Sequence, residues 1–582
     1  MKDLELSDIF ESSNARTIGA KQLSSEFIWT DSFSEILTEN NQVILGSRGS
    51  GKTALVKMLS HSNLKNIKDE RAQSVIKDKS IIATYVPLKV DWVNSVNNFG
   101  DHTDEYFKWS LNLSTCSRLI ETIKSCIEEY IEDEIEQLRL ESRISKSISE
   151  FWLGKDKVVN NLSGIQYELE RIEYMKSLFF NKLSMGLPTN DEENKAGESF
   201  HNNLFSPFSI VTKLVNREFR FDSEVTKWVL CIDEAEFLTE DHLKIINTHM
   251  RSSSDLYFKI TTMPYRHSTL GTFVSANVNI HHDLNYVYID RLGTHNKNQD
   301  IADSTIYDFA IKLFENRLKR YNFPSDIELN KLVGESQLTS LDGDFDDEKY
   351  ILSLVEKHCT PELIARANSA YRDNIELYRN SIYRKLKGLL IIREKYQNRK
   401  GNSSTSVFSG VSVIARCSDG NPRRLFRLFK HLLEGQFVEQ ISPEVQTKHL
   451  KAFSFAELEV IKFERGGREA HELMQKLGNF FKSKTHVEKL GSNTPQAINI
   501  DPSLDDETWN HIKTAVDLGL LYPSLKRNSN VKHYFPEKEG DFFLAYCLAP
   551  YFDLFPRKDR SLKIYNVLNI KARSSHEQQE LF

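Results

Sequence analysis

Cysteine is sparse in this sequence, and its placement excludes two kinds of stabilised domain. Six cysteines are spread over 582 residues, with no C-x-x-C pair and no spacing typical of metal ligands. Neither a disulfide framework nor a structural zinc site is therefore expected. We predict reduced thiols in a cytoplasmic protein. The six are Cys116, Cys126, Cys231, Cys359, Cys417 and Cys547.

Long apolar runs are also missing. No stretch approaches the roughly 20 apolar residues that a membrane-spanning helix needs. The sequence starts with the polar, acidic residues M-K-D-L-E, which do not resemble a secretory signal. We therefore expect neither a membrane span nor a membrane partner.

An excess of basic charge is absent as well, because the formal net charge is −6. This argues against a protein that binds nucleic acid over its whole surface, but it is compatible with a local basic patch. The composition, 40% hydrophobic and 27% charged, is typical of a globular protein. A chain of this length predicts about three or four domains rather than one core.

What the chain does contain is a glycine-rich loop between a predicted strand at 43–45 and a predicted helix from Thr53. The loop has the G-x-x-x-x-G-K-T pattern of a P-loop, in which glycines let backbone N–H groups turn toward phosphate oxygens. The helix N-terminus adds partial positive charge there. Lys52 would reach the β- and γ-phosphates, and the Thr53 hydroxyl would bind Mg²⁺. The predicted ATP-binding residues are Gly46, Ser47, Arg48, Gly49, Ser50, Gly51, Lys52, Thr53 and Ala54.

Two carboxylates follow a second apolar run, at 227–232. A continuous apolar run is typical of a parallel strand buried on both faces. Asp233 at its end is expected to hold Mg²⁺ together with Thr53, and Glu234 to polarise the attacking water. Glu236 fits the role of base less well. Alone, the acidic pair is also compatible with an ordinary turn.

A third predicted core strand, 256–262, ends in two hydroxyl residues. A polar side chain at this end can orient the attacking water, and Thr262 is the first candidate and Thr261 the second. The alternative is that threonines merely suit a strand. With further strands at 81–88 and 285–289, the pattern predicts an α/β P-loop core, a parallel sheet flanked by helices.

The alternation of strand and helix stops between about 104 and 187. Steps of three and four predict helices, with six apolar residues on one face. The segment is either an interaction module inserted into the core or a helical pair packed on the sheet. The six residues are Ile120, Ile123, Ile127, Ile131, Ile135 and Leu138.

The segment S-D-G-N-P-R-R at 418–424 opens another apolar helix. With the P-loop, the acidic strand and the T-T strand end, it resembles an AAA+ ATPase of the origin-recognition-type initiator branch, including its bacterial relatives. The resemblance implies a helical lid whose arginine senses the γ-phosphate. Arg423 matches that position, and Arg424 is the second choice. The alternative is an Arg-Arg pair that only faces solvent.

The resemblance also implies a homo-oligomer in ATP, with an arginine donated in trans to a neighbouring subunit. The candidates are Arg251, Arg266 and Arg291. No motif chooses among them, and Arg266 is the first guess.

The C-terminal part fits the same plan. A predicted helix ends at Gly519, a good C-cap residue, and strands at 520–525 and 531–535 flank a basic turn. Helix and basic hairpin predict a winged-helix domain that binds double-stranded DNA through phosphate contacts. The alternative is that this domain only packs or binds protein. The predicted contacts are Lys526, Arg527, Lys532 and His533.

We therefore expect an N-terminal arm at 1–22, a nucleotide-binding core at 23–300 with the insertion at about 104–199, a helical lid at 301–440, and the winged-helix domain and tail at 441–582. The expected activity is hydrolysis of ATP to ADP and phosphate, which would couple nucleotide state to assembly and DNA binding. The insertion and the long lid favour, by analogy, a bacterial ATPase of antiphage defence or mobile elements. The alternative is a nucleotide-dependent signalling scaffold that recruits a protein effector without DNA.

Overall fold

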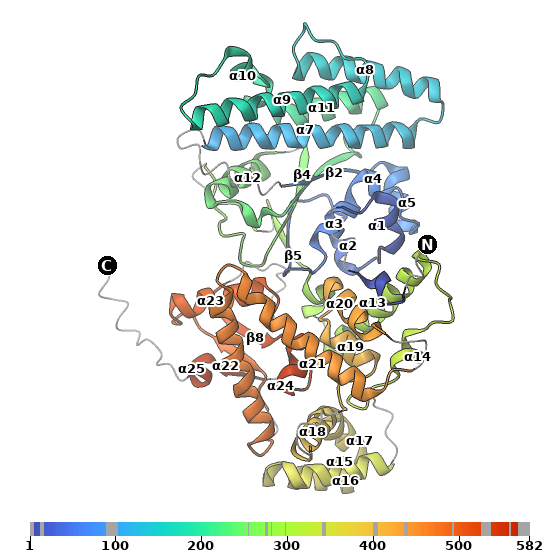
Figure 1. Cartoon of the computed structure of the whole chain (residues 1–582), viewed down its shortest axis with the longest axis vertical. Helices are drawn as coiled ribbons and strands as arrows, with labels where there is room; N and C mark the ends of the chain where they lie inside the picture. Colours follow the sequence, from blue (N-terminus) through green and yellow to red (C-terminus); the bar gives the residue numbers. More distant parts are fainter. Residues whose placement is uncertain are drawn as a thin grey trace, which may run out of the picture. The chain divides into compact units, whose positions relative to one another are not determined.

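The fold was analysed in a computed structural model, shown in Figure 1. It describes residues 5–11, 15, 17–88, 103–253, 255–273, 277–280, 282–296, 298–339, 345–399, 406–435, 440–491, 494–524, 537–557 and 560–568. The chain divides into two compact units. The core unit comprises Asn14–Leu45 and Lys52–Val287, and the C-terminal unit comprises Met1–Ser13, Gly46–Gly51 and Tyr288–Phe582.

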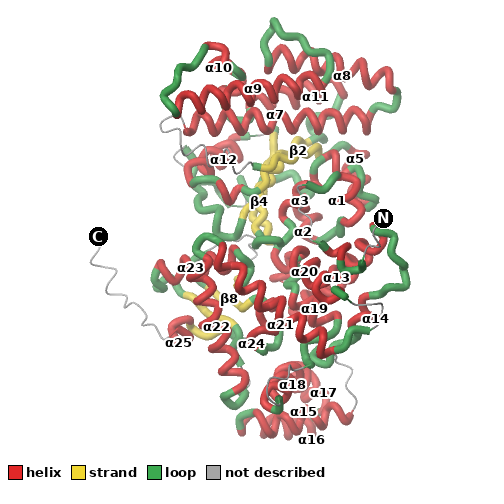
Figure 2. Tube along the Cα trace, in the orientation of Figure 1, coloured by secondary structure: helices red, strands yellow, loops and turns green. Residues whose placement is uncertain are grey.

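A five-stranded sheet with the order β2-β3-β4-β1-β5 organises the core unit (Figure 2). The pairs β2–β3, β3–β4 and β4–β1 are parallel. Parallel strands bring their carboxyl ends to one edge, so the ends of β1, β3 and β4 meet there. The predicted α/β core with a parallel sheet is confirmed. The strands are β1 (Gln42–Leu45), β2 (Ile81–Pro87), β3 (Lys227–Asp233), β4 (Leu256–Thr262) and β5 (Asn285–Tyr288).

Polar side chains secure the opposite, amino edge of this sheet. The Asn41 amide donates to the carbonyls of Met250 (2.8 Å) and Asp283 (2.9 Å), and its oxygen accepts from the Phe258 N–H (2.9 Å). The fully buried Lys259 donates to the Thr38 carbonyl at 2.7 Å. Because these buried groups are satisfied by the protein itself, the amino edge has a structural role.

Helices cover both faces of the sheet. Several begin with a side-chain cap: Thr239 caps α12, for example, by accepting from the His242 N–H. Such caps satisfy backbone N–H groups that have no partner in the first turn. Outside the inserted segment, the helices of the core unit are α1 (Ala20–Glu26), α2 (Asp31–Ile36), α3 (Lys52–Leu59), α4 (His61–Leu64), α5 (Glu70–Asp78), α11 (Ser206–Phe219) and α12 (Glu240–Ser252).

Three long helices fill the segment where the sheet pattern stops, α7 (Thr103–Tyr130), α8 (Glu134–Trp152) and α9 (Leu162–Ser184). They form a layered bundle with α11 (Figure 1). Helix α7 lies on the sheet, because the Thr84 hydroxyl of β2 is 3.0 Å from that of Thr122. The inserted segment therefore packs on the sheet, which was one of the two alternatives predicted from the sequence.

The expectation of one continuous apolar face in this segment is wrong. Helix α7 ends at Tyr130, and Asp133 starts α8 by accepting from the Glu136 N–H at 2.8 Å. Ile120, Ile123 and Ile127 are buried, whereas Ile135 and Leu138 are 61% and 67% exposed. The chain turns at 131–133, so the last two positions point to solvent on a different helix.

The C-terminal unit begins with a short N-terminal piece. In the 3₁₀ turn Asp8–Phe10, the Phe10 ring lies 5.2 Å from the rings of both Phe314 and Phe429. This start of the chain therefore packs into a helical layer instead of extending as an arm. The layer contains α13 (Gln299–Arg320), α14 (Leu329–Val333), α19 (Val411–Cys417), α20 (Pro422–Leu433) and α21 (Pro443–Val460), followed outward by α15 (Phe345–His358), α16 (Pro361–Asp373), α17 (Ile375–Tyr378) and α18 (Arg384–Gln397).

A second sheet, of order β7-β8-β6-β9, ends the unit. Its strands are β6 (Ala497–Ile500), β7 (Leu521–Ser524), β8 (Gly540–Leu544) and β9 (Ser561–Lys563), beside α22 (Gly467–His486), α23 (Asp506–Asp517), α24 (Ala549–Phe552) and α25 (Ile564–Leu568). As predicted, the helix before β7 stops at a left-handed glycine, Gly519, with φ +74°. The strand that pairs antiparallel with β7 is β8.

Several predicted features lie outside the described residues. These are the second hairpin strand at 531–535 and the four candidate DNA contacts Lys526, Arg527, Lys532 and His533. Within the described part, no helix is long and apolar enough to cross a membrane. All six cysteines are buried and none forms a disulfide.

Candidate functional site

The loop Gly46–Gly51, where the sequence predicts phosphate binding, connects β1 to α3 and lies in the C-terminal unit. Two of its glycines are left-handed, with φ +86° at Gly49 and +97° at Gly51. A Cβ on Gly49 would lie 3.0 Å from the Asn421 side-chain oxygen and 3.1 Å from the Arg423 Cβ. Glycine is therefore required there by both the backbone angle and the close approach of α20.

Protein oxygens already hold the first half of this loop. The Ser47 N–H donates to the Asp290 carboxylate at 3.0 Å, and the Ser47 hydroxyl donates to it at 2.6 Å. The Arg48 N–H donates to the Asp517 carbonyl at 3.1 Å, and the Arg48 guanidinium forms an ion pair with Glu464. These two N–H groups are therefore directed at protein oxygens of the C-terminal unit.

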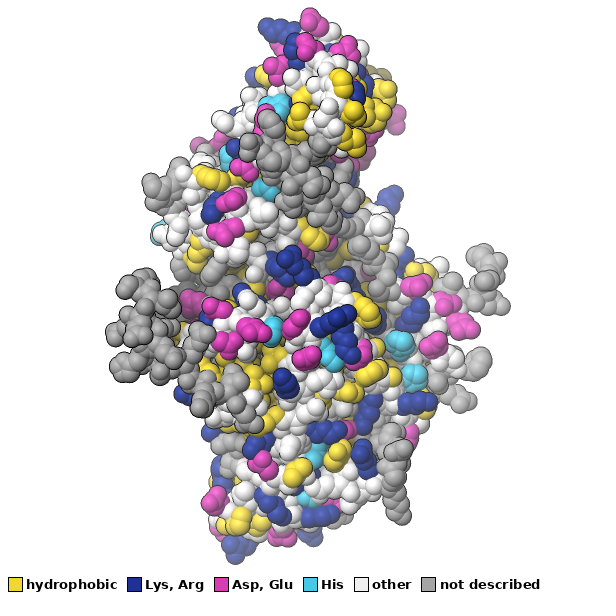
Figure 3. Space-filling model, turned by 60° about the vertical axis from the view of Figure 1, so that its left-hand side comes forward, with side chains coloured by type: hydrophobic (Ala, Val, Ile, Leu, Met, Phe, Trp, Pro, Cys, Tyr) yellow, Lys and Arg dark blue, Asp and Glu magenta, His cyan; other side chains and the backbone are white. Residues whose placement is uncertain are grey.

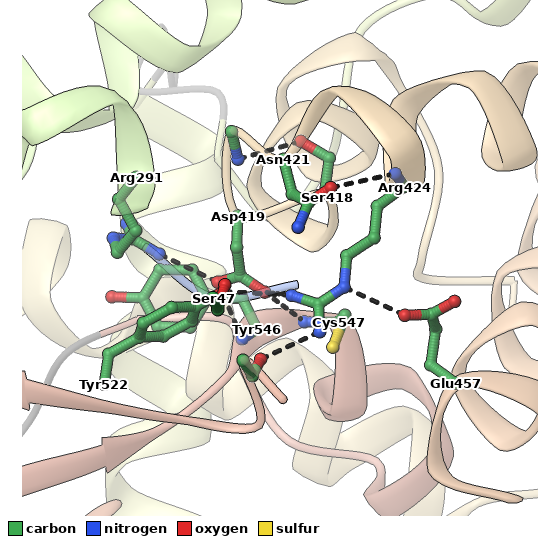
Figure 4. Close-up of polar contacts among 12 residues, drawn as sticks. Ser47, Arg291, Ser418, Asp419, Asn421, Arg424, Glu457, Tyr522, Tyr546 and Cys547 are labelled. Carbon is green, nitrogen blue, oxygen red and sulfur yellow. Dashed lines mark hydrogen bonds and ion pairs between the residues drawn. The ribbon is translucent and has the colours of Figure 1, made fainter. Parts of the chain in front are cut away.

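A buried ionic network lies beside Ser47 of the loop, within the C-terminal unit (Figure 4). Its centre is Asp419, whose fully buried carboxylate accepts from Arg291 (2.9 Å) and Arg424 (3.2 Å). The backbone N–H groups of Tyr546 and Cys547 also donate to it, at 3.0 and 3.1 Å. Four donors compensate the desolvation of this charge.

The two neighbouring arginines of α20 have different environments. Arg424 is buried and donates to Glu457 (2.9 Å), the Gly519 carbonyl (2.8 Å) and the Tyr522 hydroxyl (3.0 Å). Arg423 is exposed, and its Cβ stands next to Gly49 of the loop. Of the two predicted sensors, Arg424 is occupied by structural contacts, and Arg423 is the one exposed beside the loop.

In the core unit, the predicted acidic pair lies at the carboxyl end of β3. Asp233 is fully buried and accepts from the Tyr85 hydroxyl at 2.9 Å and from the Thr261 hydroxyl at 2.5 Å. The Thr261 hydroxyl also accepts from the Glu234 N–H at 3.0 Å. Glu234 itself has a left-handed backbone, with φ +66° and ψ 44°.

The two candidate threonines of β4 differ in the same way. Thr261 is bonded to the acidic residues, whereas the buried Thr262 hydroxyl has no hydrogen-bond partner among the described residues. Thr262 pairs in register with Leu45, the last residue of β1 before the loop. A buried hydroxyl without a partner is costly unless a ligand uses it, so this position fits a nucleotide with its Mg²⁺.

The three candidate trans arginines are not equivalent. Arg291 is buried, is bound to Asp419, and its guanidinium lies 4.2 Å from the centre of the Tyr546 ring. It is committed within its own chain, which removes it as a candidate. Arg251 donates to the Asn277 carbonyl at 3.0 Å, and Arg266 is exposed in the turn after β4.

The sequence reasoning missed Tyr85, Asp290 and Asp419. Asp290 carried a usable signal, since a carboxylate directly after a core strand is the same pattern that identified Asp233. Tyr85 carried none, because its hydroxyl reaches Asp233 across 148 residues of sequence. Asp419 belongs to the S-D-G-N-P-R-R motif, but only the structure places four donors around it.

No curated protein matches the sequence of the chain. A family model described as ORC-CDC6-like matches residues 8–564, which is nearly the whole chain. This match confirms the resemblance indicated by the P-loop, the acidic strand and the lid motif. The chain therefore belongs to the ORC-CDC6-like family of initiator-type AAA+ proteins.

Proposed function

We propose that this chain hydrolyses ATP and uses the nucleotide state to control its own assembly and its binding to double-stranded DNA. The family match supports an AAA+ ATPase in general terms. The observation that carries the proposal is the carboxyl edge of the core sheet, where a hydrogen-bonded acidic pair lies on β3 and a buried, unpartnered hydroxyl lies at the end of β4. An acidic pair can bind Mg²⁺ and accept a proton from water, and a free hydroxyl can orient that water, so these groups support a hydrolytic site.

Each residue has a separate role in this proposal. Lys52 binds the β- and γ-phosphates, while Thr53 and Asp233 hold Mg²⁺, which neutralises charge on the phosphates when bound. Glu234 accepts a proton from the attacking water, and Thr262 orients that water. Because Ser47 and Arg48 donate their N–H groups to Asp290 and Asp517, we assign the phosphate cradle to residues 49–54.

Arg423 would report the nucleotide state to the helical layer that carries it. Arg423 is the second residue of α20, which begins at Pro422 and is capped by Asn421. The Asn421 amide also donates to the Arg48 carbonyl at 3.1 Å. An arginine that contacts the γ-phosphate can shift its helix only if the start of that helix is firmly held beside the loop. The bond from Asn421 to the Arg48 carbonyl holds it there. We assign the arginine in trans to Arg266.

Glu234→Gln tests the catalytic half of the proposal. Removing the proton acceptor should lower kcat by about 100-fold or more while ATP binding is retained, because a general base contributes about 10²–10⁴-fold. Lys52→Ala should lose ATP binding. Glu236→Gln, a matched change two residues further along, should keep normal turnover. Normal ATPase rates in Glu234→Gln would overturn the assignment.

A DNA titration tests the second half. Double-stranded DNA should stimulate hydrolysis, and replacing Lys526, Arg527, Lys532 and His533 by alanine should remove the response. Phosphate contacts also make the affinity fall steeply with salt. If no DNA binds in a gel shift at low salt, the proposal that the chain binds DNA fails.

The proposed role in antiphage defence has its own test. If the role is correct, Glu234→Gln should abolish protection in a phage plating assay.

The alternative function, a signalling scaffold for a protein effector, draws on one specific observation. The inserted helices expose large apolar side chains, and apolar side chains gather on the upper part of the molecule in Figure 3. Such patches are typical of protein-binding surfaces. If this function holds, purification with endogenous partners should give a complex whose mass depends on ATP or ADP, and DNA should have no effect. The exposed residues include Ile135, Leu138, Phe151, Tyr167, Tyr174 and Met185.

A further inference from the structure

We infer that Thr261 and Tyr85 are positioning residues that hold the two acidic residues in the geometry needed for Mg²⁺ and the attacking water. The inference rests on the proposed ATP hydrolysis. It assigns a role in the reaction to Tyr85, which no sequence motif singled out. It also separates Thr261 from Thr262, which the sequence presented as alternatives for one role.

The Thr261 hydroxyl connects both acidic residues through a single oxygen. It donates its only proton to Asp233 (2.5 Å) and accepts the N–H of Glu234 (3.0 Å). A hydroxyl has one donor and two acceptor positions, so these two bonds fix its orientation. Movement of either acidic residue would therefore break a bond to the same atom.

The backbone of Glu234 needs such a restraint. Its left-handed conformation (φ +66°, ψ 44°) is uncommon for a residue with a side chain, and such strain persists where surrounding contacts maintain it. The bond from the Glu234 N–H to Thr261 is one such contact. Since the conformation sets the direction of the Glu234 side chain, the bond to Thr261 contributes to where the proposed base points.

Tyr85 holds the other side of Asp233. Pro87 pairs in register with Asp233, so Tyr85, two residues earlier on β2, shares a face with Pro87. Its hydroxyl donates to the second carboxylate oxygen at 2.9 Å. Both Asp233 oxygens thus have a hydroxyl donor from a neighbouring strand, which fixes the carboxylate plane. Outer hydrogen bonds of this kind orient metal-binding carboxylates.

Alternation along β4 separates the two threonines. Consecutive strand residues point to opposite faces, so Thr262 cannot take part in the contacts that Thr261 makes. Its buried hydroxyl has no partner within the described residues. Thr261 is therefore the positioning residue, and Thr262 keeps the proposed contact with the water.

The test compares Thr261→Val, which removes the hydroxyl at similar volume, with Thr261→Ser, which keeps it. Thr261→Val should lower kcat by about 10- to 100-fold, as expected for loss of an outer hydrogen bond. It should also raise the Mg²⁺ concentration needed for half-maximal binding of a fluorescent ATP analogue. Thr261→Ser should restore both values to near wild type.

Thr84→Val is the matched control. Thr84 is an equally buried strand threonine whose hydroxyl bonds to Thr122 rather than to an acidic residue. Its loss should change stability to a similar extent but leave kcat and the Mg²⁺ requirement unchanged. If Thr84→Val and Thr261→Val shift the Mg²⁺ requirement equally, or neither shifts it, the inference is overturned.

Two further outcomes separate this inference from the proposed function. If the wild type binds the Mg²⁺-dependent analogue but does not hydrolyse ATP, the proposed function fails, and the Mg²⁺ titration of Thr261→Val still decides the inference. If Thr261→Val does not fold in a thermal unfolding scan, Tyr85→Phe replaces it. That variant keeps the ring and should raise the Mg²⁺ requirement; an unchanged requirement would contradict the inference.

Discussion

Arg423 and Arg424 are adjacent in sequence, yet Arg423 is exposed beside the loop Gly46–Gly51 and Arg424 is buried in an ion network. The N-P-R-R motif predicts an arginine at the start of the lid helix, but the motif alone does not tell which of the two is available. The difference arises from contacts with Asp419, Glu457 and Gly519, which are set by tertiary packing.

Stability and activity should therefore separate at these two positions. Arg424→Ala should lower the free energy of unfolding by about 3–5 kcal/mol, because it leaves Asp419 and Glu457 as buried charges with too few donors. Arg423→Ala should change it by about 0.5 kcal/mol or less, as for other surface substitutions, but should lower kcat. Chemical denaturation and ATPase assays on both variants check this, and equal stability losses would contradict it.

At the scale of single elements, local patterns predicted the strands well and the insertion less well. An apolar run that ends in Asp233 is a signal contained within a few residues. The spacing of apolar residues through 120–138 was equally regular, but α7 ends at Tyr130 and α8 begins after Asp133. The sequence Asp133-x-x-Glu136 does match a helix-capping pattern, and it was the signal that should have divided the segment.

A buried histidine of α4 contacts two hydroxyl groups of α7. His61 hydrogen-bonds through Nδ1 to the Ser125 hydroxyl (2.9 Å) and through Nε2 to the Tyr130 hydroxyl (3.0 Å). Burial lowers the pKa of His61 to about 3, helped by the charge of Lys65. The ring is therefore neutral where it holds the insertion to the core.

This depressed pKa predicts loss of stability in acid. The unfolded chain takes up a proton on His61 near its ordinary pKa of about 6.5, whereas the folded chain excludes it down to about pH 3. The stabilisation is present above pH 6.5 and declines as the pH falls, by roughly 3 kcal/mol at pH 4. His61→Gln should flatten this slope in denaturation curves between pH 8 and 4, and identical slopes would contradict the assignment.

At the scale of the whole chain, the first six residues of the P-loop motif, Gly46–Gly51, belong to the C-terminal unit. The loop Gly46–Gly51 is held by residues that lie hundreds of positions away in sequence, among them Asp290, Asn421 and Asp517. Such long-range contacts leave no local pattern, so the sequence predicted the loop but not what holds it. The α23–β7 corner is part of this support, because a Cβ on Gly519 would lie 2.7 Å from the Ser47 hydroxyl oxygen.

Gly519→Ala should therefore disturb nucleotide binding from a residue far along the chain. Its strained φ of +74° costs about 1–2 kcal/mol for a residue with a Cβ, and the added methyl group pushes on Ser47. We expect KM for ATP to rise roughly tenfold, within the 100-fold that a misplacement of about 1 Å can cost. Gly435→Ala is the matched control, with φ +68° but no described atom within 4 Å of the added Cβ. It should lose a similar amount of stability and keep the wild-type KM. An equal rise in KM for both variants would mean that general destabilisation, and not contact with the loop, is responsible.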